Sequence, residues 1–388
     1  MSVGIDEISF YTSNYYLDLR TLAQQQQTDP EKYYTGIGQE KMGMPAPDED
    51  IVTMAANAAL PIIERIGSDT ISTLLFATET GIDQSKSAGV YVHRLLGLHS
   101  NCRVVELKQA CYSATAALQM ACALVERQPE RKVLVIASDI ARYELGTPGE
   151  ATQGCGAVAM LISAAPRLLE IYPEVGNFTD DVMDFWRPNY RATALVDGKY
   201  STKIYLKALK KAWEHFVQAT SASFTDFGRF CYHLPFSRMA QKAHQHLAKL
   251  NHTELTPVEI EQQIEDTLRY NQIIGNSYTA SMYIGLCSLL EHCQENLSEQ
   301  KIGFFSYGSG CVAEFFSGRV MPGYQQALHR QRHAQLLEAR QAVSYDEYLQ
   351  LWHHPDPQQG ESLMIPHTTP GRFRLAAISH HKREYVIC

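Results

Sequence analysis

The stretch "VELKQACYSATAALQM", residues 105–120, decides the fold class and points to a chemistry. A strand-like apolar run ends just before Cys111, and the small, mostly apolar residues after it follow helical spacing. Because apolar residues cover nearly all sides of this helix, we expect it to be buried, with its N-terminus facing the protein interior. Backbone N–H groups there carry partial positive charge, so the Cys111 thiol should ionise easily and act as a nucleophile. The alternative is an ordinary core cysteine.

Strand and helix patterns alternate on both sides of this stretch. Continuous apolar character at 132–141 and 154–164 is typical of strands in a sheet that is covered on both faces. Strands and helices that take turns predict a layered α/β fold. The other elements expected in this half are strands at 3–12, 72–78 and 102–108, and helices at 49–63, 84–98 and 111–127.

The pattern of strands and helices in the second half of the chain resembles that of the first half. The segment "QACYSATAALQMACALVE" resembles "GNSYTASMYIGLCSLLEH" in rhythm, and "QGCGAVAMLI" compares with "GFFSYGSGCVAEFF". We infer an internal duplication at the scale of a domain, although any α/β protein repeats strand–helix patterns. The predicted halves are residues 1–165, with the nucleophilic cysteine, and residues 166–388, with a histidine and a glycine-rich turn.

Composition narrows the class of function. The 388-residue chain carries a net charge of −8, which disfavours a general nucleic-acid binder and means that a phosphate-bearing ligand needs a local cluster of cations. No apolar run is long enough to cross a bilayer, and the N-terminus lacks the pattern of a signal peptide. We therefore expect a cytoplasmic protein whose nine cysteines are reduced thiols. Cys287, His292 and Cys293 match no zinc spacing, so no metal site is predicted.

Three further features lie where α/β folds display ligand sites, at the ends of strands. Glu79 follows the apolar run "LLFAT", so the pKa of its carboxyl should rise toward neutrality and suit it to proton transfer. The alternative for Glu79 is an acid that interacts with a helix dipole. His233 ends another short strand in "FCYHLPF", although a lone histidine there is more often structural. The turn "YGSGC", residues 307–311, would offer backbone N–H groups to a ligand.

Taken together, these residues resemble the thiolase superfamily and, within it, the bacterial 3-hydroxy-3-methylglutaryl-CoA (HMG-CoA) synthase family. The matching segments run in order over nearly the whole chain, and the stretch past about residue 325 resembles the family least. The segments are "GIDEISFY", "GIGQEKM", "ATETGID", "ELKQACYSATAALQ", "VLVIASDIARYE", "EATQGCGAVAML", "DFWRP", "LVDGKYS", "YHLPFSRM", "GNSYTASMY" and "FSYGSGCVAEF".

The resemblance implies a fold, an assembly and a reaction. The fold would be thiolase-like, with two similar halves forming a five-layer αβαβα core, and the protein would be a homodimer. The reaction would be a Claisen condensation of acetyl-CoA with acetoacetyl-CoA and water in the mevalonate pathway. It would give HMG-CoA and CoA through an acetyl-Cys111 intermediate. CoA thioesters would be the substrates, and no cofactor, metal, nucleic acid or membrane would take part.

The resemblance also implies roles for individual residues. Cys111 would be the nucleophile, Glu79 would remove a proton from the acetyl methyl, and His233 would orient acetoacetyl-CoA and protonate the new alkoxide. The N–H groups of Cys111 and Ser309 would form an oxyanion hole. The substrate contacts implied by matching positions are Asp29, Tyr143, Thr152, Phe185, Ser201, Arg238, Lys242, Asn276 and Ser309. Lys203 and Lys207 are either neighbours of the CoA phosphates or part of a solvated helix face.

Four alternatives remain open. A thiolase would use a second cysteine, and Cys311 stands after the "YGSG" turn where the family has a small residue such as serine. A ketoacyl carrier-protein synthase would use Cys111, His233 and Asn276, but that class has no acid at the position of Glu79. A polyketide β-branching HMG synthase shares the chemistry and takes its acceptor from a carrier protein. A CoA-binding protein with an inactive site is the alternative that is not an enzyme.

Overall fold

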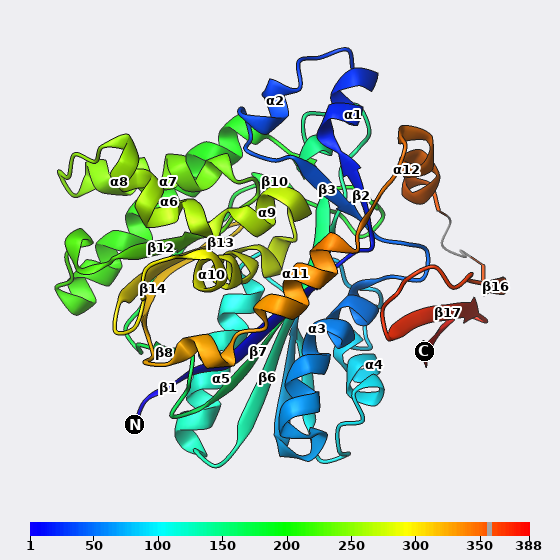
Figure 1. Cartoon of the computed structure of the whole chain (residues 1–388), viewed down its shortest axis with the longest axis horizontal. Helices are drawn as coiled ribbons and strands as arrows, with labels where there is room; N and C mark the ends of the chain where they lie inside the picture. Colours follow the sequence, from blue (N-terminus) through cyan, green and yellow to red (C-terminus); the bar gives the residue numbers. More distant parts are fainter. Residues whose placement is uncertain (355–358) are drawn as a thin grey trace.

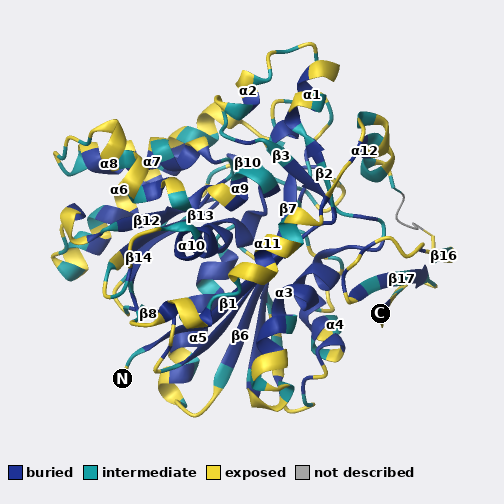
Figure 2. Ribbon diagram, in the orientation of Figure 1, coloured by how far each residue is buried: buried dark blue, intermediate teal, exposed yellow. Residues whose placement is uncertain are grey.

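The structure, a computed structural model, describes residues 1–354 and 359–388 (Figure 1). A sheet runs through the centre of the molecule, and most of it is buried (Figure 2). Its strands, in spatial order, are β12 (Arg229–Tyr232), β13 (Lys301–Gly308), β14 (Val312–Val320), β8 (Leu169–Ile171), β1 (Val3–Thr12), β7 (Gly154–Ala164), β6 (Lys132–Ala141), β4 (Ile71–Ala77) and β5 (Arg103–Leu107), with β9 (Gly176–Thr179) paired to β14.

Helices on and between the two halves of this sheet complete the layers. They are α3 (Ile51–Ile66), α4 (Ala88–Leu95), α5 (Ser113–Arg127), α6 (Gly198–Thr220), α7 (Arg238–Leu250) and α10 (Ser281–His292). Apolar residues of α5 and α10 share one central core with strands of both halves. A second core joins α3 and α4 to the first half, and a third joins α6 and α7 to the second half. The predicted α/β fold with a five-layer core is confirmed.

The two halves form one hydrogen-bonded sheet because the short strand β8 bridges them. β8 pairs with β1 on one side and with β14 on the other, and both pairings are antiparallel. Each half places a central helix before an antiparallel hairpin, with α5 preceding β6 and β7 and α10 preceding β13 and β14. The internal repeat inferred from the sequence is therefore present in the fold.

The helix expected at 111–127 begins two residues later, at Ser113, and is not buried on all sides. Ala110 has φ 44°, a left-handed conformation that is uncommon for a residue with a side chain, and it keeps the backbone before Ser113 out of the helix. Met120 on the far side of α5 is 50% exposed. The sequence could not separate this exposed face from the buried one, because alanines occupy both faces and Met120 is as apolar as the buried residues.

The last part of the chain returns to the first half. Its elements are α11 (Arg330–Glu338), β15 (Gln341–Ala342), α12 (Tyr345–Trp352), β16 (Leu363–Met364), β17 (Phe373–Ser379) and β18 (Lys382–Ile387). The last two strands, β17 and β18, pair antiparallel in a separate small sheet whose apolar residues pack with those of α3. The boundary at residues 165 and 166 stays a prediction.

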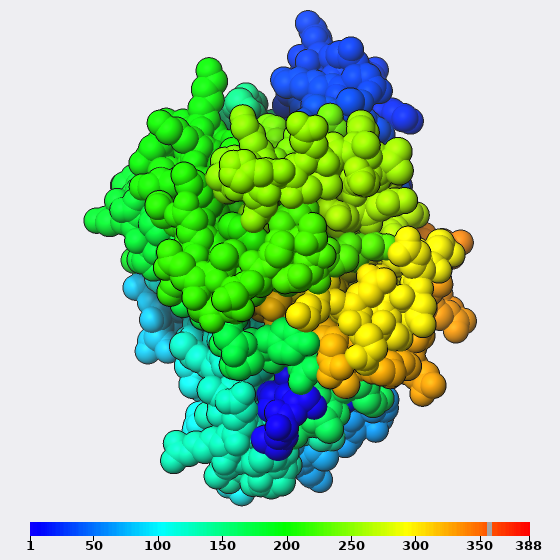
Figure 3. All heavy atoms as spheres, turned by 90° about the vertical axis from the view of Figure 1, so that its left-hand side faces the viewer, coloured from blue at the N-terminus to red at the C-terminus, as the bar shows by residue number. Residues whose placement is uncertain are grey.

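Smaller elements fill the edges. In Figure 3, the segment that includes α6, α7 and α8 covers much of the visible face, and the blue segment near the N-terminus projects above it. The strands are β2 (Tyr15–Asp18), β3 (Lys41–Met44), β10 (Phe185–Trp186) and β11 (Leu195–Val196), and the α-helices are α1 (Leu19–Gln25), α2 (Glu31–Tyr34), α8 (Pro257–Ile264) and α9 (Arg269–Ile274). The 3₁₀ turns are η1 (Ser68–Thr70), η2 (Glu150–Thr152), η3 (Phe224–Asp226), η4 (Glu265–Thr267), η5 (Tyr278–Ala280) and η6 (Tyr324–Ala327).

Within residues 1–354 and 359–388, no helix has both the length and the apolar character that a membrane span requires. The same residues contain no group of three or more histidine, cysteine or acidic side chains placed to hold a metal ion. All nine cysteines lie within the described residues, and each is a free thiol.

Candidate active site

Cys111 lies in the turn between β5 and α5, and its sulfur contacts a carboxyl group from another strand. The Cys111 Sγ donates a hydrogen bond of 2.9 Å to Glu79 Oε1. Glu79 follows β4, which lies between β5 and β6 in the sheet. The structure thus brings together two residues that the sequence analysis assigned to one site from separate segments.

The electrostatics of Cys111 differ from the prediction. Burial raises the pKa of the Cys111 thiol well above its ordinary value, and the adjacent Glu79 carboxyl raises it further. The sulfur also precedes the first helical residue, Ser113, so it lies at the margin of the helix dipole rather than in its first turn. The prediction that Cys111 ionises easily is therefore wrong. Cys111 is a thiol at neutral pH and needs a base to accept its proton.

Glu79 is suited to be that base. Burial raises the pKa of the Glu79 carboxyl to about 8, and the negative charge of Asp139 adds to the rise. The contact with Cys111 and the positive charge of Arg187 act in the opposite direction. Arg187 also donates a hydrogen bond to the backbone carbonyl of Glu79, which ties the loop after β10 to this strand end. The predicted rise in the pKa of Glu79 toward neutrality is confirmed.

Asp139, on β6, holds Glu79 in place and was missed by the sequence analysis. Its Oδ1 accepts hydrogen bonds from the backbone N–H groups of Glu79 and Thr80, at 2.9 and 3.0 Å. Its Oδ2 accepts from the hydroxyl of Thr279 at 2.5 Å, in the turn η5 of the second half. Asp139 therefore holds the backbone at Glu79 in place and links the two halves. The available signal was a single acid in the apolar run "VLVIASDIA".

His233 follows β12 and is buried at 4% exposure. Its ring Nδ1 is 3.0 Å from the hydroxyl of Ser281, and its carbonyl accepts a 2.9 Å hydrogen bond from Tyr205. Burial lowers the pKa of His233 to about 3, so the imidazole is neutral at physiological pH. A neutral ring exchanges protons by donating from one nitrogen and accepting at the other.

The glycine-rich turn lies against the turn that carries Cys111. A side chain at Gly308 would come within 2.4 Å of the Gln109 carbonyl oxygen, so glycine is required for this approach. The Gln109 amide donates a 3.2 Å hydrogen bond to the carbonyl of Ser309. Asp184 holds the other side of the turn, accepting from Gly310 N–H at 2.9 Å. The two turns are therefore in contact, as an oxyanion hole built from Cys111 and Ser309 would need.

Aromatic side chains wall the space beside Cys111. The rings of Tyr143, Phe185 and Tyr278 meet edge to face, with centroids 5.7 to 6.4 Å apart, and they pack with Cys111 in one cluster. The Tyr278 hydroxyl is buried without a hydrogen-bond partner among the described residues. An unpaired buried hydroxyl beside the thiol is available to a polar atom of a substrate. Tyr278 was missed because its sequence signal, one tyrosine in "GNSYTAS", is weak.

Two further predicted contacts lie behind these rings. Thr152 and Asn276 meet through a 3.2 Å hydrogen bond from the Asn276 N–H to the Thr152 carbonyl. The Asn276 side-chain oxygen accepts from the Tyr278 N–H at 2.9 Å, which sets the turn that carries that ring. Ser201 lies further out, at the start of α6, where its hydroxyl donates to Asp184 at 3.3 Å.

The residues expected at the CoA entrance lie on the surface. Arg238 and Lys242 are exposed on α7, and the Arg238 N–H donates to the Ile37 carbonyl of the first half at 3.0 Å. Asp29 is exposed before α2, where its carboxylate caps the following turn. The structure records no contact between these residues and Cys111. Lys207 pairs with Asp180 at 2.7 Å, which favours the solvated-face interpretation for that lysine.

Comparisons with known proteins agree with this geometry. The sequence matches the family described as hydroxymethylglutaryl-coenzyme A synthase N terminal over residues 1–166, and its C-terminal counterpart over residues 174–257 and 248–359. The hydroxymethylglutaryl-CoA synthase of Enterococcus faecalis is 42% identical over 349 residues, covering 90% of this chain and 91% of that protein.

Two other relatives bear on the substrate. A crystal structure described as HMG-CoA synthase complexed with CoA superposes with a TM-score of 0.95 at 40% identity, covering 100% of both chains. The polyketide-biosynthesis 3-hydroxy-3-methylglutaryl-ACP synthase of Bacillus subtilis is 34% identical over 369 residues, covering 90% of this chain and 87% of that protein. With a Cys–Glu pair at the meeting of two similar halves and family matches over most of its length, the chain belongs to the hydroxymethylglutaryl-CoA synthase family.

Proposed function

We propose that this protein condenses acetyl-CoA with acetoacetyl-CoA and water to give HMG-CoA and CoA. The observation that carries the proposal is the 2.9 Å contact between the Cys111 sulfur and the Glu79 carboxyl in a chain of this family. A nucleophile in contact with a base whose pKa is about 8 is the arrangement that acyl transfer followed by proton abstraction requires.

The first step transfers the acetyl group to Cys111. The thiol proton passes to the Glu79 carboxylate while the sulfur attacks the thioester carbonyl of acetyl-CoA. The tetrahedral oxyanion collapses, and Glu79 returns the proton to the sulfur of CoA, which leaves as a thiol and restores the Glu79 carboxylate. The N–H groups of Cys111 and Ser309 are suited to stabilise that oxyanion because the two turns are in contact.

The second step forms the carbon–carbon bond. Glu79 removes a proton from the methyl of acetyl-Cys111, and the resulting carbanion attacks the ketone of acetoacetyl-CoA. His233, being neutral, donates a proton from one ring nitrogen to the new alkoxide and regains one from solvent. Water then cleaves the thioester to Cys111, Glu79 returns the methyl proton to the departing sulfur, and HMG-CoA is released. The balance of atoms needs no cofactor beyond the CoA thioesters themselves.

The decisive experiment is a condensation assay that follows loss of acetoacetyl-CoA on addition of acetyl-CoA. We expect stoichiometric HMG-CoA from the wild-type chain. A second arm replaces the CoA thioesters with acetyl and acetoacetyl carrier proteins, because one relative, at 34% identity, is an ACP synthase. Faster turnover in that arm would favour the polyketide alternative, and binding without turnover in both arms would favour an inactive CoA-binding protein.

We propose that the protein works as a homodimer through the edge of the sheet at β5. This edge strand carries Val105 at 42% exposure, and Met120 on the adjoining α5 is 50% exposed. An unpaired strand edge beside exposed apolar side chains is suited to pairing with a second copy. Light scattering at micromolar concentration should give a dimer mass, and Val105→Lys should give a monomer.

The free thiols fit a reducing compartment, and we place the protein in the cytoplasm.

A further inference from the structure

A row of polar side chains on α5 faces the second half of the protein. Tyr112, at the N-cap of α5, Thr115 and Gln119 are three and four residues apart, so they lie on one side of the helix. The Thr115 hydroxyl is 2.8 Å from both Tyr283 on α10 and Ser306 on β13. These hydrogen bonds cross an otherwise apolar core.

Glu314 on β14 receives the two ends of this row. The Tyr112 hydroxyl donates to its Oε2 at 2.7 Å, and the Gln119 amide donates to its Oε1 at 2.7 Å. The side chain is buried, with Glu314 only 3% exposed, and Ser306 is its cross-strand neighbour. Both carboxylate oxygens thus accept hydrogen bonds from residues of one helix. Because a buried polar group left unpaired is destabilising, these bonds hold α5 in one rotation and one axial position.

The same hairpin carries the glycine-rich turn. Gly308 and Val312 close the β13–β14 hairpin, and Glu314 lies two residues beyond Val312. Gly308 packs against the backbone and Cβ of Tyr112, the residue that follows Cys111. The tip of this hairpin therefore contacts the turn that carries Cys111, and Glu314, further along the same hairpin, accepts hydrogen bonds from α5.

We propose that Glu314 is a positioning residue for the condensation, holding α5 through Tyr112 and Gln119 so that Cys111 stays aligned with the turn at 308–310. The inference rests on the proposed role of Cys111 as the acetylated nucleophile. Burial, opposed by the two hydrogen bonds, raises the pKa of Glu314 to about 6, so the carboxylate is charged and accepts both bonds at neutral pH. Misplacement of a reacting group by about 1 Å lowers rates on the order of 10²-fold.

The test measures the single-turnover rate constant for acetylation of Cys111 by acetyl-CoA, by rapid quench and mass spectrometry of the Cys111 peptide. Glu314→Ala should lower this rate constant about 10- to 100-fold with little change in KM. Glu314→Gln should stay within about threefold of wild type, because its oxygen accepts from Gln119 and its amide donates to the Tyr112 hydroxyl oxygen.

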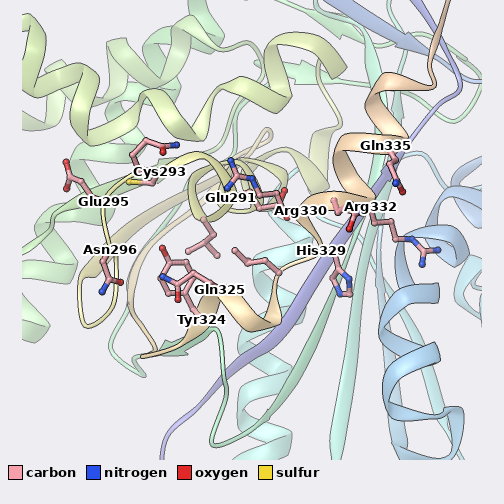
Figure 4. A pocket seen from close by; sticks show the side chains of 14 residues that line it. Glu291, Cys293, Glu295, Asn296, Tyr324, Gln325, His329, Arg330, Arg332 and Gln335 are labelled. Atoms are coloured by element: carbon pink, nitrogen blue, oxygen red, sulfur yellow. The ribbon is translucent and has the colours of Figure 1, made fainter.

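A matched control is Glu291→Ala, on α10. Glu291 is also 3% exposed and is also held by two donors, Tyr270 and His333, but it lines the cavity of about 970 Å³ between the end of α10 and α11 (Figure 4). Both alanine variants should lose thermal stability. Only Glu314→Ala should acetylate slowly, so equal slowing in the two variants would overturn the proposal.

A second variant guards against misfolding of Glu314→Ala. Gln119 is partly exposed, so Gln119→Leu should fold, and it removes one of the two donors. We expect Gln119→Leu to be acetylated about threefold more slowly than the wild type. The double variant Gln119→Leu, Glu314→Gln should be no slower than Gln119→Leu alone, because the two residues share one contact. Wild-type rates in Gln119→Leu and Glu314→Ala would reject positioning by Glu314. A wild-type chain that never acetylates would instead reject the proposed function.

Discussion

The two central helices hold equivalent places in the two halves but serve the site differently. α5 follows the turn that presents Cys111, and it keeps one exposed face. α10 is buried along nearly its whole length and contributes the hydroxyl of Ser281, which is 3.0 Å from the His233 ring. The comparison teaches that two copies of one strand–helix unit can divide a reaction. In the proposed mechanism the first copy supplies the nucleophile and its base, and the second supplies neutral polar groups and the glycine-rich turn.

Burial has opposite effects on the titrating groups of the two halves. It raises the pKa of Glu79 to about 8 in the first half, and it lowers the pKa of His233 to about 3 in the second. In both cases burial disfavours the charged form. At pH 7 most of the Glu79 carboxyl is therefore protonated and the His233 ring is neutral, so in the proposed mechanism Glu79 must first lose its proton before it acts as a base.

The strongest test of this division replaces the one cysteine in each half that lies at an active-site turn. Cys111→Ser should abolish the acetyl adduct and lower kcat by at least about 10⁴-fold, because the thiol makes the covalent bond. The measurement is mass spectrometry of the protein after incubation with acetyl-CoA, paired with the condensation assay.

Cys311→Ser is the matched variant in the second half. Cys311 is buried, and burial raises the pKa of its thiol to about 11, so it is a poor nucleophile where it lies. We expect the adduct to remain on Cys111 in this variant. An acetyl group on Cys311, or loss of turnover in Cys311→Ser equal to that in Cys111→Ser, would favour a thiolase with two catalytic cysteines.

The next largest effect concerns the base of the first half. Glu79→Gln should form acetyl-Cys111 much more slowly, because the amide oxygen keeps the hydrogen bond from the thiol but cannot take its proton, which must then pass to solvent. Condensation should fall about 10²- to 10⁴-fold, since the methyl proton has no acceptor. Separate assays of the acetyl adduct and of HMG-CoA formation check this. Normal condensation by Glu79→Gln would remove Glu79 from the mechanism and leave the second half to supply the base.

Much of this site could be predicted because its residues mark the ends of regular elements. The apolar strand before Glu79 predicted a buried carboxyl with a raised pKa, and the turn before α5 predicted the place of Cys111. The ionisation of Cys111 could not be predicted in the same way. It depends on the burial of the sulfur and on a carboxyl 32 positions away in the chain, and these two effects outweigh the helix dipole.

Asp139 shows a second limit of the sequence. Its carboxylate is buried at 0% exposure and accepts hydrogen bonds from threonines that come from both halves of the chain, including Thr78 and Thr279. Neither threonine has a pattern that marks it as a partner. A buried acid in an apolar strand signals that partners exist, but only the fold, which brings β4, β6 and η5 together, identifies them.

The opposite pKa shifts predict the pH dependence of the reaction. Glu79 acts as a base only when it has lost its proton, so kcat/KM should rise about tenfold per pH unit below pH 8 and level off above it. His233, with a pKa of about 3, should add no second ionisation between pH 5 and 8. Steady-state assays from pH 5 to well above pH 8 check both statements. A second break near pH 6.5, below which kcat/KM falls more steeply than tenfold per pH unit, would mean that His233 titrates as an ordinary imidazole.

The smallest expected effects distinguish two lysines on the outer helices of the second half. Lys242 on α7 is exposed and has no acidic partner among the described residues, whereas Lys207 on α6 is paired with Asp180. We expect Lys242→Ala to raise KM for acetyl-CoA about tenfold, as loss of a charged contact to a phosphate would do. Lys207→Ala should change KM by less than about twofold, because an exposed ion pair contributes little. Both constants come from steady-state assays at fixed acetoacetyl-CoA. Equal effects in the two variants would extend the CoA phosphate site across α6, and no effect in either would move it away from α7.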